Sequence, residues 1–336
     1  MLAIQFKYLG DAVILTPALK ALATQVKNIE LHVLVAAEVA PLLEGLPWIA
    51  KVWAMPRQRG KVKLWQSIPF IYALRCERFD QSVDFGGNDR GALLSYLSGA
   101  KNRLGSSDHD DSKLLRKICY TQMVRRLDPG APYFDLHFEL LKAWNIKRPE
   151  YLNIEIVSSG VDRLSNTLPK DSILCHISTS QSKKDWPLRH WQSFYHLASD
   201  AGLILVFSAG PNQREQNLLK DLKSRLPQVR TLPPIEDLQS FLSVLKCARI
   251  FVSGDTGPLH FAEGLNVPVL GIFGVDNSIK QVAPIYRQEN LICANECDCH
   301  FLVNHTATCQ SSSSCMSSIQ PEAVFQKLNI ILKSLA

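Results

Sequence analysis

Strand-like apolar runs alternate with amphipathic helical runs along most of this chain, and that alternation constrains its fold most. In the first half, LAIQF, ELHVLV, KVWAM and FDQSVDF have the composition of strands. In the second half, SILCHIS, LILVFSAG, RIFVS and VPVLGIF repeat the scheme. Strands that alternate with helices are typical of parallel sheets. The pattern therefore predicts an α/β protein built from two Rossmann-like units.

The length of 336 residues suits two domains of about 150 residues each. We place the join in KRPEYLNIEIVSSG, which leaves one unit and enters the next. The prediction is an N-terminal domain over 1–155, a C-terminal domain over 156–320 and a last helix over 321–336. That helix could cross back onto the first domain.

Composition excludes several classes of protein. With 46% apolar and 20% charged residues, the chain is not disordered, collagenous or a coiled coil. No apolar run approaches the roughly 20 residues that span a bilayer. The first residues, MLAIQFKYLGDAV, do not have the organisation of a signal peptide, so we expect a cytoplasmic protein.

The net charge of +6 is carried by the first half. Residues 1–150 hold 21 Lys and Arg against 15 Asp and Glu, whereas the remainder is balanced at 16 against 16. Such asymmetry favours an anionic partner, namely a phosphorylated glycan, a membrane surface or a nucleic acid, over a merely soluble basic surface. One segment is spaced to form a basic helical face beside Leu114, Leu115 and Ile118: Lys113, Arg116, Lys117, Arg125 and Arg126. It is either a solvated face or a contact for acceptor or membrane.

Asp11 follows the first predicted strand directly and opens a helix. Ligands of doubly wound folds bind at the carboxyl ends of the strands, where a carboxylate can act as a general base. The alternative is an aspartate that caps the helix N-terminus.

The segment STSQSKKDWP also leads from a strand into a helix. Its hydroxyls at Thr179 and Ser180, the cation at Lys184 and the helix start at Pro187 suit a phosphate or diphosphate. The glycine spacing of a P-loop is absent.

A third segment, VSGDTGPLHFAEG, places Asp255, Thr256, Gly257 and His260 where they can converge on an anion. An aspartic protease also contains DTG, but it needs two such carboxylates in an all-β fold. This chain has one DTG and a βα pattern, which excludes that reading.

These segments resemble, in order along the chain, the lipopolysaccharide heptosyltransferases. The resemblance rests on GDAVILTPAL at 10–19, KDWPLRHW at 184–191 and SGDTGPLHFAEGLNVPVLGIFG at 253–274. The segment DFGGNDRGALLSYLSGAKNRLG at 84–105 and the C-terminal CM followed by IQPEAVF add to the resemblance. It implies a GT-B fold, in which the parallel sheets of two Rossmann-like domains face a central cleft.

The resemblance also implies a metal-independent, inverting transfer of heptose from ADP-L-glycero-D-manno-heptose to an inner-core lipopolysaccharide or lipid A glycan. Asp11 would be the general base and Lys184 would neutralise the diphosphate. The implied donor-binding residues are Thr179, Ser180, Lys184, Glu215, Ile235, Asp255, Thr256, Gly257 and His260. Glu215 would bind the ribose and Ile235 would lie near adenine, although an exposed glutamate and an ordinary loop residue are equal alternatives.

The implied acceptor-binding residues are Asn88, Arg90, Arg57 and Arg59. The two last arginines belong to a basic loop that a solvated surface explains as well as a phosphate clamp does. The chain departs from the family at FKYLGD, where relatives commonly carry an arginine and small residues before the glycine. That departure leaves the acceptor hydroxyl open.

Five of the nine cysteines crowd near the C-terminus. Cys297, Cys299, Cys309 and Cys315 could form a closed zinc or iron site, and a branch of the family has an iron-binding cluster there. Free thiols and disulfides are the alternatives, the latter disfavoured in the cytosol.

Three other readings compete with the implied function. The same fold could use another nucleotide sugar, or a protein or different glycan as acceptor. A nucleotide-binding relative without catalysis is a second reading, against which the intact Asp11, Lys184 and Asp255 argue. A nucleic-acid binder is the third and has only positive charge in its favour, since no recognition motif is present. We therefore expect a cytoplasmic enzyme, in peripheral contact with the inner membrane, that binds no nucleic acid.

Overall fold

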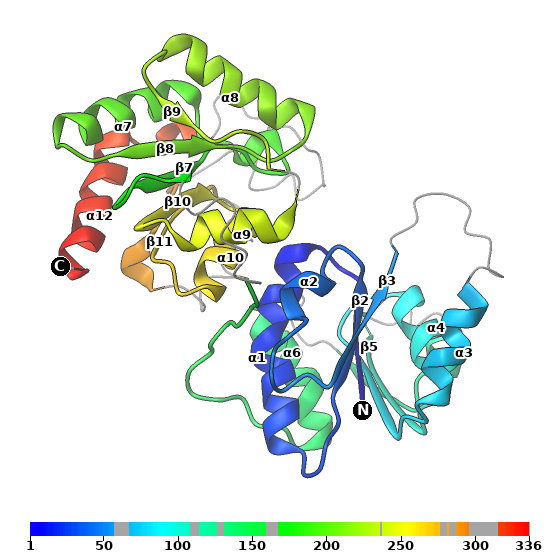
Figure 1. The fold of residues 1–336 in the computed structure, drawn as a ribbon. Coiled ribbons are helices and arrows are strands. Elements are labelled where there is room, and N and C mark those ends of the chain that lie inside the picture. Colours follow the sequence, from blue (N-terminus) through cyan, green and yellow to red (C-terminus); the bar gives the residue numbers. More distant parts are fainter. Residues whose placement is uncertain are drawn as a thin grey trace. The chain divides into compact units, whose positions relative to one another are not determined.

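The computed structural model describes residues 1–56, 67–107, 114–125, 131–158, 167–235, 237–275, 281, 287–295 and 315–335. The chain divides into two compact units, Met1–Val157 and Ser158–Ala336, called here the first and second units. Both are visible in Figure 1. Among the described residues, no helix combines the length and apolar composition needed to cross a membrane.

The first unit is a six-stranded parallel sheet in the order β3-β2-β1-β4-β5-β6. Figure 1 shows α1, α2 and α6 on one face of this sheet and α3 and α4 on the other. Its elements are β1 (Leu2–Gln5), α1 (Leu9–Gln25), β2 (His32–Ala36), α2 (Ala40–Leu43), β3 (Lys51–Met55), α3 (Ile68–Cys76), β4 (Gln81–Asp84), α4 (Asp89–Leu97), β5 (Asn102–Ser107), α5 (Leu114–Cys119), β6 (Gln122–Arg125) and α6 (Tyr133–Leu141).

The second unit repeats the topology, with a parallel sheet in the order β12-β11-β10-β7-β8-β9. Its elements are β7 (Ile173–His176), α7 (Leu188–Asp200), β8 (Leu205–Ser208), α8 (Gln213–Arg225), β9 (Arg230–Thr231), α9 (Leu238–Lys246), β10 (Ile250–Gly254), α10 (Gly257–Gly264), β11 (Val269–Phe273), β12 (Leu291–Cys293) and α12 (Pro321–Ser334). Both orders are the Rossmann order, so the predicted pair of Rossmann-like units is confirmed.

The strands are apolar because the helices cover both faces of each sheet. Every residue of β1, β2, β7, β10 and β11 is buried. A strand buried on two faces needs no alternation of polar and apolar residues, which explains the continuous apolar runs of the sequence. The core of the first unit includes Leu2, Ile4 and Leu34, and that of the second unit includes Trp186 and Trp191.

The last helix belongs to the second unit. The apolar face of α12 is buried through Val324, Leu328 and Ile331 in the core of that unit, and α12 packs against α7. That this helix also crosses onto the first domain stays a prediction.

Residues 105–133 differ from the single basic face that their spacing suggests. Arg116 and Lys117 belong to α5, whereas Arg125 lies on β6. Arg116 Nε donates to Asp89 Oδ1 at 3.0 Å, so its charge is paired. Lys113 and Arg126 lie outside the described residues. The short strands β5 and β6 escaped prediction because neither is a continuous apolar run.

Candidate functional site

The polar motifs of the second unit meet where its strand order reverses. From β7 the chain proceeds through β8 to β9 on one side, and from β10 through β11 to β12 on the other. The neighbours β7 and β10 are parallel, so their carboxyl ends share one edge of the sheet. Crevices at such switch points bind the ligands of open α/β sheets. The loop with Thr179 and Lys184 follows β7, and Asp255 follows β10.

The two loops are packed directly against each other. A Cβ added at Gly254 would lie 3.1 Å from Thr179 Cγ2 and 3.3 Å from the Lys184 carbonyl oxygen. Only a glycine at the end of β10 leaves this approach unstrained. The glycine of the SGDTG motif thereby brings the two motifs together.

Lys184 and Asp255 form an ion pair across the two loops. Lys184 ends a 3-10 turn, Ser182–Lys184, and its Nζ donates to Asp255 Oδ2. The side chains are 21% and 13% exposed, so the pair is largely shielded and still reachable from solvent. An ammonium group held in advance by a carboxylate loses little freedom when an anion joins it. This geometry suits a diphosphate.

His260 is buried beside this ion pair on α10. Burial lowers its pKa to about 4, while Asp255 raises the pKa and Lys184 lowers it. The imidazole is therefore neutral near pH 7. Thr256 and Gly257 form the start of α10, whose backbone N–H groups face the same end of the sheet.

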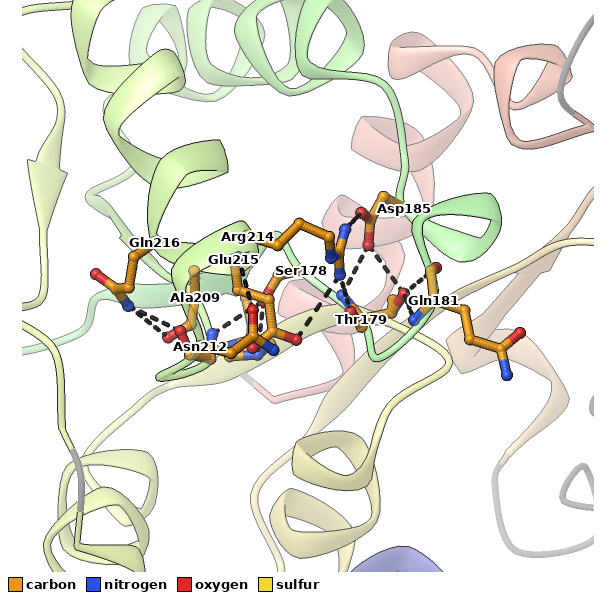
Figure 2. A network of polar contacts seen from close by, with 11 residues as sticks. Ser178, Thr179, Gln181, Asp185, Ala209, Asn212, Arg214, Glu215 and Gln216 are labelled. Atoms are coloured by element: carbon orange, nitrogen blue, oxygen red, sulfur yellow. Dashed lines mark hydrogen bonds and ion pairs between the residues drawn. The ribbon is translucent and has the colours of Figure 1, made fainter. Parts of the chain in front are cut away.

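A network centred on Asp185 holds the loop after β7 in shape (Figure 2). Asp185 Oδ1 accepts from the Thr179 backbone N–H at 2.7 Å and from the Thr179 hydroxyl at 2.9 Å. Arg214, in the first turn of α8, donates to Asp185 Oδ2 and to the Thr179 carbonyl oxygen. The Thr179 hydroxyl also donates to the Gln181 carbonyl oxygen at 2.6 Å. Thr179 is only 2% exposed, so these contacts favour a structural part for its hydroxyl.

Sequence reasoning missed Asp185 and Arg214. Asp185 sits beside the conspicuous Lys184, and its proximity to the helix start was the only local signal. Arg214 lies 29 residues further along the chain, and the residues around it give no sequence signal for its contact with Asp185. Both residues act on the loop that carries Lys184.

We expect Asp185→Ala to lower the free energy of unfolding by about 1–3 kcal/mol, because it leaves the Thr179 N–H without its acceptor and removes one of the two acceptors of the Arg214 guanidinium. Chemical denaturation of the variant measures this change. Asp221→Ala, which removes an exposed carboxylate from the middle of α8, is the matched control and should shift stability by less than about 0.5 kcal/mol. Equal effects of the two substitutions would contradict a structural network.

Glu215 lies beside this network, in the first turn of α8. Its backbone N–H donates to the cap residue Asn212 at 3.0 Å. The side chain is 7% exposed, and burial raises its pKa against the lowering influence of Arg214. A Cβ on Gly210 would overlap the Glu215 carboxylate, so the turn after β8 carries a glycine that makes room for it. The exposed-glutamate alternative is excluded, while ribose binding stays a prediction.

The two remaining donor-side candidates lie in loops. Ser180 is exposed beside Thr179, and Ile235 is half-buried before α9. Their parts in donor binding stay predictions.

Stability should fall as the pH is lowered below about 6.5. Burial lowers the pKa of both His176, at the end of β7, and His260 to about 4. Since the unfolded side chains titrate near 6.5, the unfolded state binds more protons between these two pH values. Glu263 opposes this effect, because burial raises its pKa to about 7 despite Arg287 and the folded state then holds the proton. Two histidines outweigh one carboxyl group.

Thermal unfolding at pH 7 and pH 5 measures this balance, and we expect a lower Tm at pH 5. Glu263→Gln should steepen the loss, since it removes the opposing group. A Tm that is equal or higher at pH 5 would contradict the assignment of two neutral, buried histidines.

The first unit also carries its candidates at the switch point, here between β1 and β4. Asp11 lies in the first turn of α1, where Asp11 Oδ2 accepts from the Tyr8 backbone N–H at 3.1 Å. Asn88 is the N-cap of α4 and accepts from the Gly91 N–H at 2.9 Å. Both follow adjacent parallel strands. Asp11 thus takes part in its helix start as the third helical residue, which accepts from the cap residue Tyr8, and is not itself the cap residue. A role as base stays a prediction.

Arg90 is exposed on α4, and its guanidinium lies 4.5 Å from the Phe6 ring centroid. The other two predicted acceptor arginines, Arg57 and Arg59, lie outside the described residues.

Sequence reasoning missed a buried carboxylate beneath these candidates. Asp84, the last residue of β4, is fully buried and accepts from the Tyr120 hydroxyl at 2.6 Å and from the Gly86 N–H at 2.8 Å. Burial and the neighbouring Asp84 raise the pKa of Tyr120. These bonds shape the turn that leads to Asn88.

The cysteine cluster falls largely outside the described part of the chain. Cys297, Cys299 and Cys309 lie outside the described residues, whereas Cys293 is exposed and Cys315 is half-buried. Within the described ranges, no group of three or more His, Cys, Asp or Glu side chains could hold a metal ion. Cys315 packs on the apolar core of the second unit, which suits a buried thiol.

Comparison with known proteins places this fold and these motifs in one family. The model of glycosyltransferase family 9 (heptosyltransferase) matches residues 68–310, more than two thirds of the chain. The chain belongs to this family. It is a glycosyltransferase of 336 residues with the two-unit architecture described above.

Relatives and solved structures agree. The lipopolysaccharide heptosyltransferase 1 of Pseudomonas aeruginosa is 26% identical, over 82% of this chain and 79% of that protein. The enzyme of the same name from Campylobacter coli is 22% identical, over 96% of each chain. The structure of E. coli ADP-heptose lps heptosyltransferase II has a TM-score of 0.77 at 18% identity, covering 100% of this chain and 99% of that one. E. coli heptosyltransferase WaaC with ADP gives 0.69 at 18%, covering 99% and 97%.

Proposed function

We propose that this family 9 glycosyltransferase moves a heptose, with inversion, from ADP-L-glycero-D-manno-heptose to an anionic inner-core lipopolysaccharide glycan. The observation that carries the proposal is the convergence of Lys184, Asp255 and His260 at the switch point of the second unit. A solved fold neighbour is described with bound ADP, which supports an ADP-linked donor. The relatives' names support lipopolysaccharide as the acceptor.

The second unit takes the donor in this proposal. Lys184 balances the charge that ADP gains as the bond between the anomeric carbon and the phosphate oxygen breaks. The start of α10, at Thr256 and Gly257, supplies backbone N–H groups to the same anion. Asp255 holds Lys184 in position and contacts the donor sugar.

The first unit takes the acceptor. Asp11 accepts the proton of the acceptor hydroxyl as the oxygen attacks the anomeric carbon. Asn88 and Arg90 face the acceptor, and the excess positive charge of the first half matches an anionic glycan. The enzyme works in the cytoplasm, in contact with the inner membrane that carries its lipid-linked acceptor.

A panel of thermal shifts with ADP, UDP, GDP and CMP tests the donor. At about 100 times the Kd, a bound nucleotide stabilises the protein by ~2.7 kcal/mol, which is roughly 5–11 °C for domains of this size. Of the four nucleotides, we expect only ADP to raise the Tm. In a separate assay, we expect ADP to be released when ADP-heptose and an inner-core glycan are both present. A shift with UDP or GDP instead would discard the named sugar. The absence of any shift would favour a relative without catalysis.

We further propose that no metal takes part in catalysis and that the C-terminal cysteines hold a structural zinc or iron ion. Four thiolates suit a closed tetrahedral site, while free thiols and disulfides are the other states this cluster can adopt. Elemental analysis of protein purified without chelator distinguishes these states. Less than about a tenth of an equivalent of metal would remove the metal site.

A further inference from the structure

Two helices of the first unit are apolar in sequence yet bury little. Of the nine residues of α3, IPFIYALRC, only Leu74 is buried. Of the six residues of α5, LLRKIC, only Cys119 is buried. Helix α4 contacts both of them, and Figure 1 shows α3 and α4 side by side on one face of the sheet. A helix with this composition normally turns its apolar side to a partner.

Exposed apolar side chains gather on these three helices. Seven of the twelve large hydrophobic side chains that are exposed in the described chain belong to them, although the helices contain only a small part of its residues. Leu114 and Tyr72 are 74% and 70% exposed. We call this surface the α3–α5 face; its apolar members are Ile68, Tyr72, Leu93, Tyr96, Leu114, Leu115 and Ile118. A concentration of this kind marks an interaction surface.

The charges on this face are positive. Arg75 packs against Gly99 at the end of α4, and the guanidinium of Arg103 lies 5.5 Å from the Tyr96 ring centroid. Lys117 is exposed on α5. The only acidic residue within the three helices is Asp89, and its carboxylate is paired with Arg116. Among the described residues of the three helices, cations therefore border the apolar side chains, and the one acid is ion-paired.

We propose that the α3–α5 face binds the surface of an anionic lipid bilayer. Tyrosine and aliphatic side chains insert at the level of the headgroups, and arginine and lysine pair with lipid phosphates. Each cation is attracted to the negative surface of an anionic bilayer, and the apolar side chains add the area that they bury. Charge complementarity favours an anionic bilayer over a neutral or basic apolar partner.

This proposal names the surface for the membrane contact that belongs to the proposed function. It uses none of the donor-site residues or Asp11. Vesicle binding is measured without nucleotide sugar or glycan, so a failure of binding leaves the proposed reaction untouched. Conversely, binding by an enzyme that does not use ADP-heptose would leave this surface in place.

Co-sedimentation with vesicles tests it, using the full chain with phosphatidylcholine alone and with an equimolar mixture of phosphatidylcholine and phosphatidylglycerol. We expect binding to the anionic vesicles that weakens as salt is raised. The variant Tyr72→Ser/Leu114→Ser/Ile118→Ser should lose binding by roughly tenfold or more. The matched control, Tyr151→Ser/Ile204→Ser/Ile330→Ser, removes one tyrosine and two aliphatic side chains that are exposed elsewhere, and it should bind like the unmodified protein.

Lys117→Glu provides a single, exposed substitution that does not depend on the folding of the triple variant. It should weaken binding to the anionic vesicles and leave the Tm unchanged. Three results would overturn the proposal: no binding of the unmodified protein to anionic vesicles, equal binding of the face variant and its control, or a dimer that light scattering shows to dissociate in the face variant. The last would mean that a second copy of the chain covers this face.

Discussion

Asp11→Ala should turn over roughly a hundred to ten thousand times more slowly than the unmodified enzyme, if Asp11 is the general base. Without that carboxylate, the acceptor hydroxyl must lose its proton to water as it attacks. Initial rates of ADP release at saturating ADP-heptose and acceptor measure the change. The loss should appear in kcat, because the carboxylate accepts the proton only in the transition state.

The difficulty with Asp11 is that its carboxylate also accepts a hydrogen bond at the start of α1. Asp11→Asn separates the two roles, since an amide oxygen still accepts from the Tyr8 N–H but is no base. We expect this variant to be as slow as Asp11→Ala and to unfold like the unmodified protein. A kcat for Asp11→Asn within about fivefold of the unmodified enzyme would reduce Asp11 to a capping residue.

Asp237→Ala is the matched control for capping. Asp237 is the N-cap of α9, where its carboxylate accepts from the Ser240 N–H at 2.7 Å. Those bonds lower the pKa of Asp237. Its removal should cost about 1 kcal/mol of stability and leave kcat unchanged. A large fall of kcat in this variant would show that helix capping alone affects turnover.

Lys184→Ala should raise the barrier by about 2.7–4 kcal/mol, which is roughly a hundred- to a thousandfold in kcat. The leaving ADP would then develop its charge without the ammonium group, while Asp255 remains at the site as an unpaired carboxylate. The affinity for ADP should fall as well, because Lys184 also faces the diphosphate of the product. Steady-state kinetics together with ADP titration measure both effects.

Lys183→Ala is the control for Lys184, since Lys183 lies in the same 3-10 turn and removes the same charge from the loop. It should keep kcat within a few-fold of the unmodified enzyme. Equal losses in the two variants would mean that the loop is only generally electropositive, and that no specific ammonium is positioned by Asp255.

Much of the fold follows from local sequence. Strands such as LAIQ and IFVSG begin with apolar runs, and Trp191, Phe194 and Ala198 recur on the buried side of α7. These patterns repeat within a few residues, so each element can be recognised without its neighbours. The polar residues Asp11, Lys184 and Asp255 are likewise predicted near strand ends, because each lies in the segment that leads from an apolar run into a helix. The strands that escaped prediction lack such a run, as β5, β6 and β9 do, or are as short as the three residues of β12.

Strand order and side-chain partners needed the tertiary structure. No local sequence pattern predicts that β7 pairs with β10, because the neighbour of a strand depends on how the helices cover both faces of the whole sheet. That pairing puts Lys184 on Asp255, and the packing of α8 puts Arg214 on Asp185. The hydrogen bond between Tyr120 and Asp84, which are 36 residues apart, could not be predicted from the sequence for the same reason. The sequence by itself determined the elements, their parallel class and the ends that carry the chemistry, since these depend on short-range periodicity. Only the tertiary structure decided which charged residues form ion pairs, because the partners are distant in sequence and become neighbours only when the elements pack.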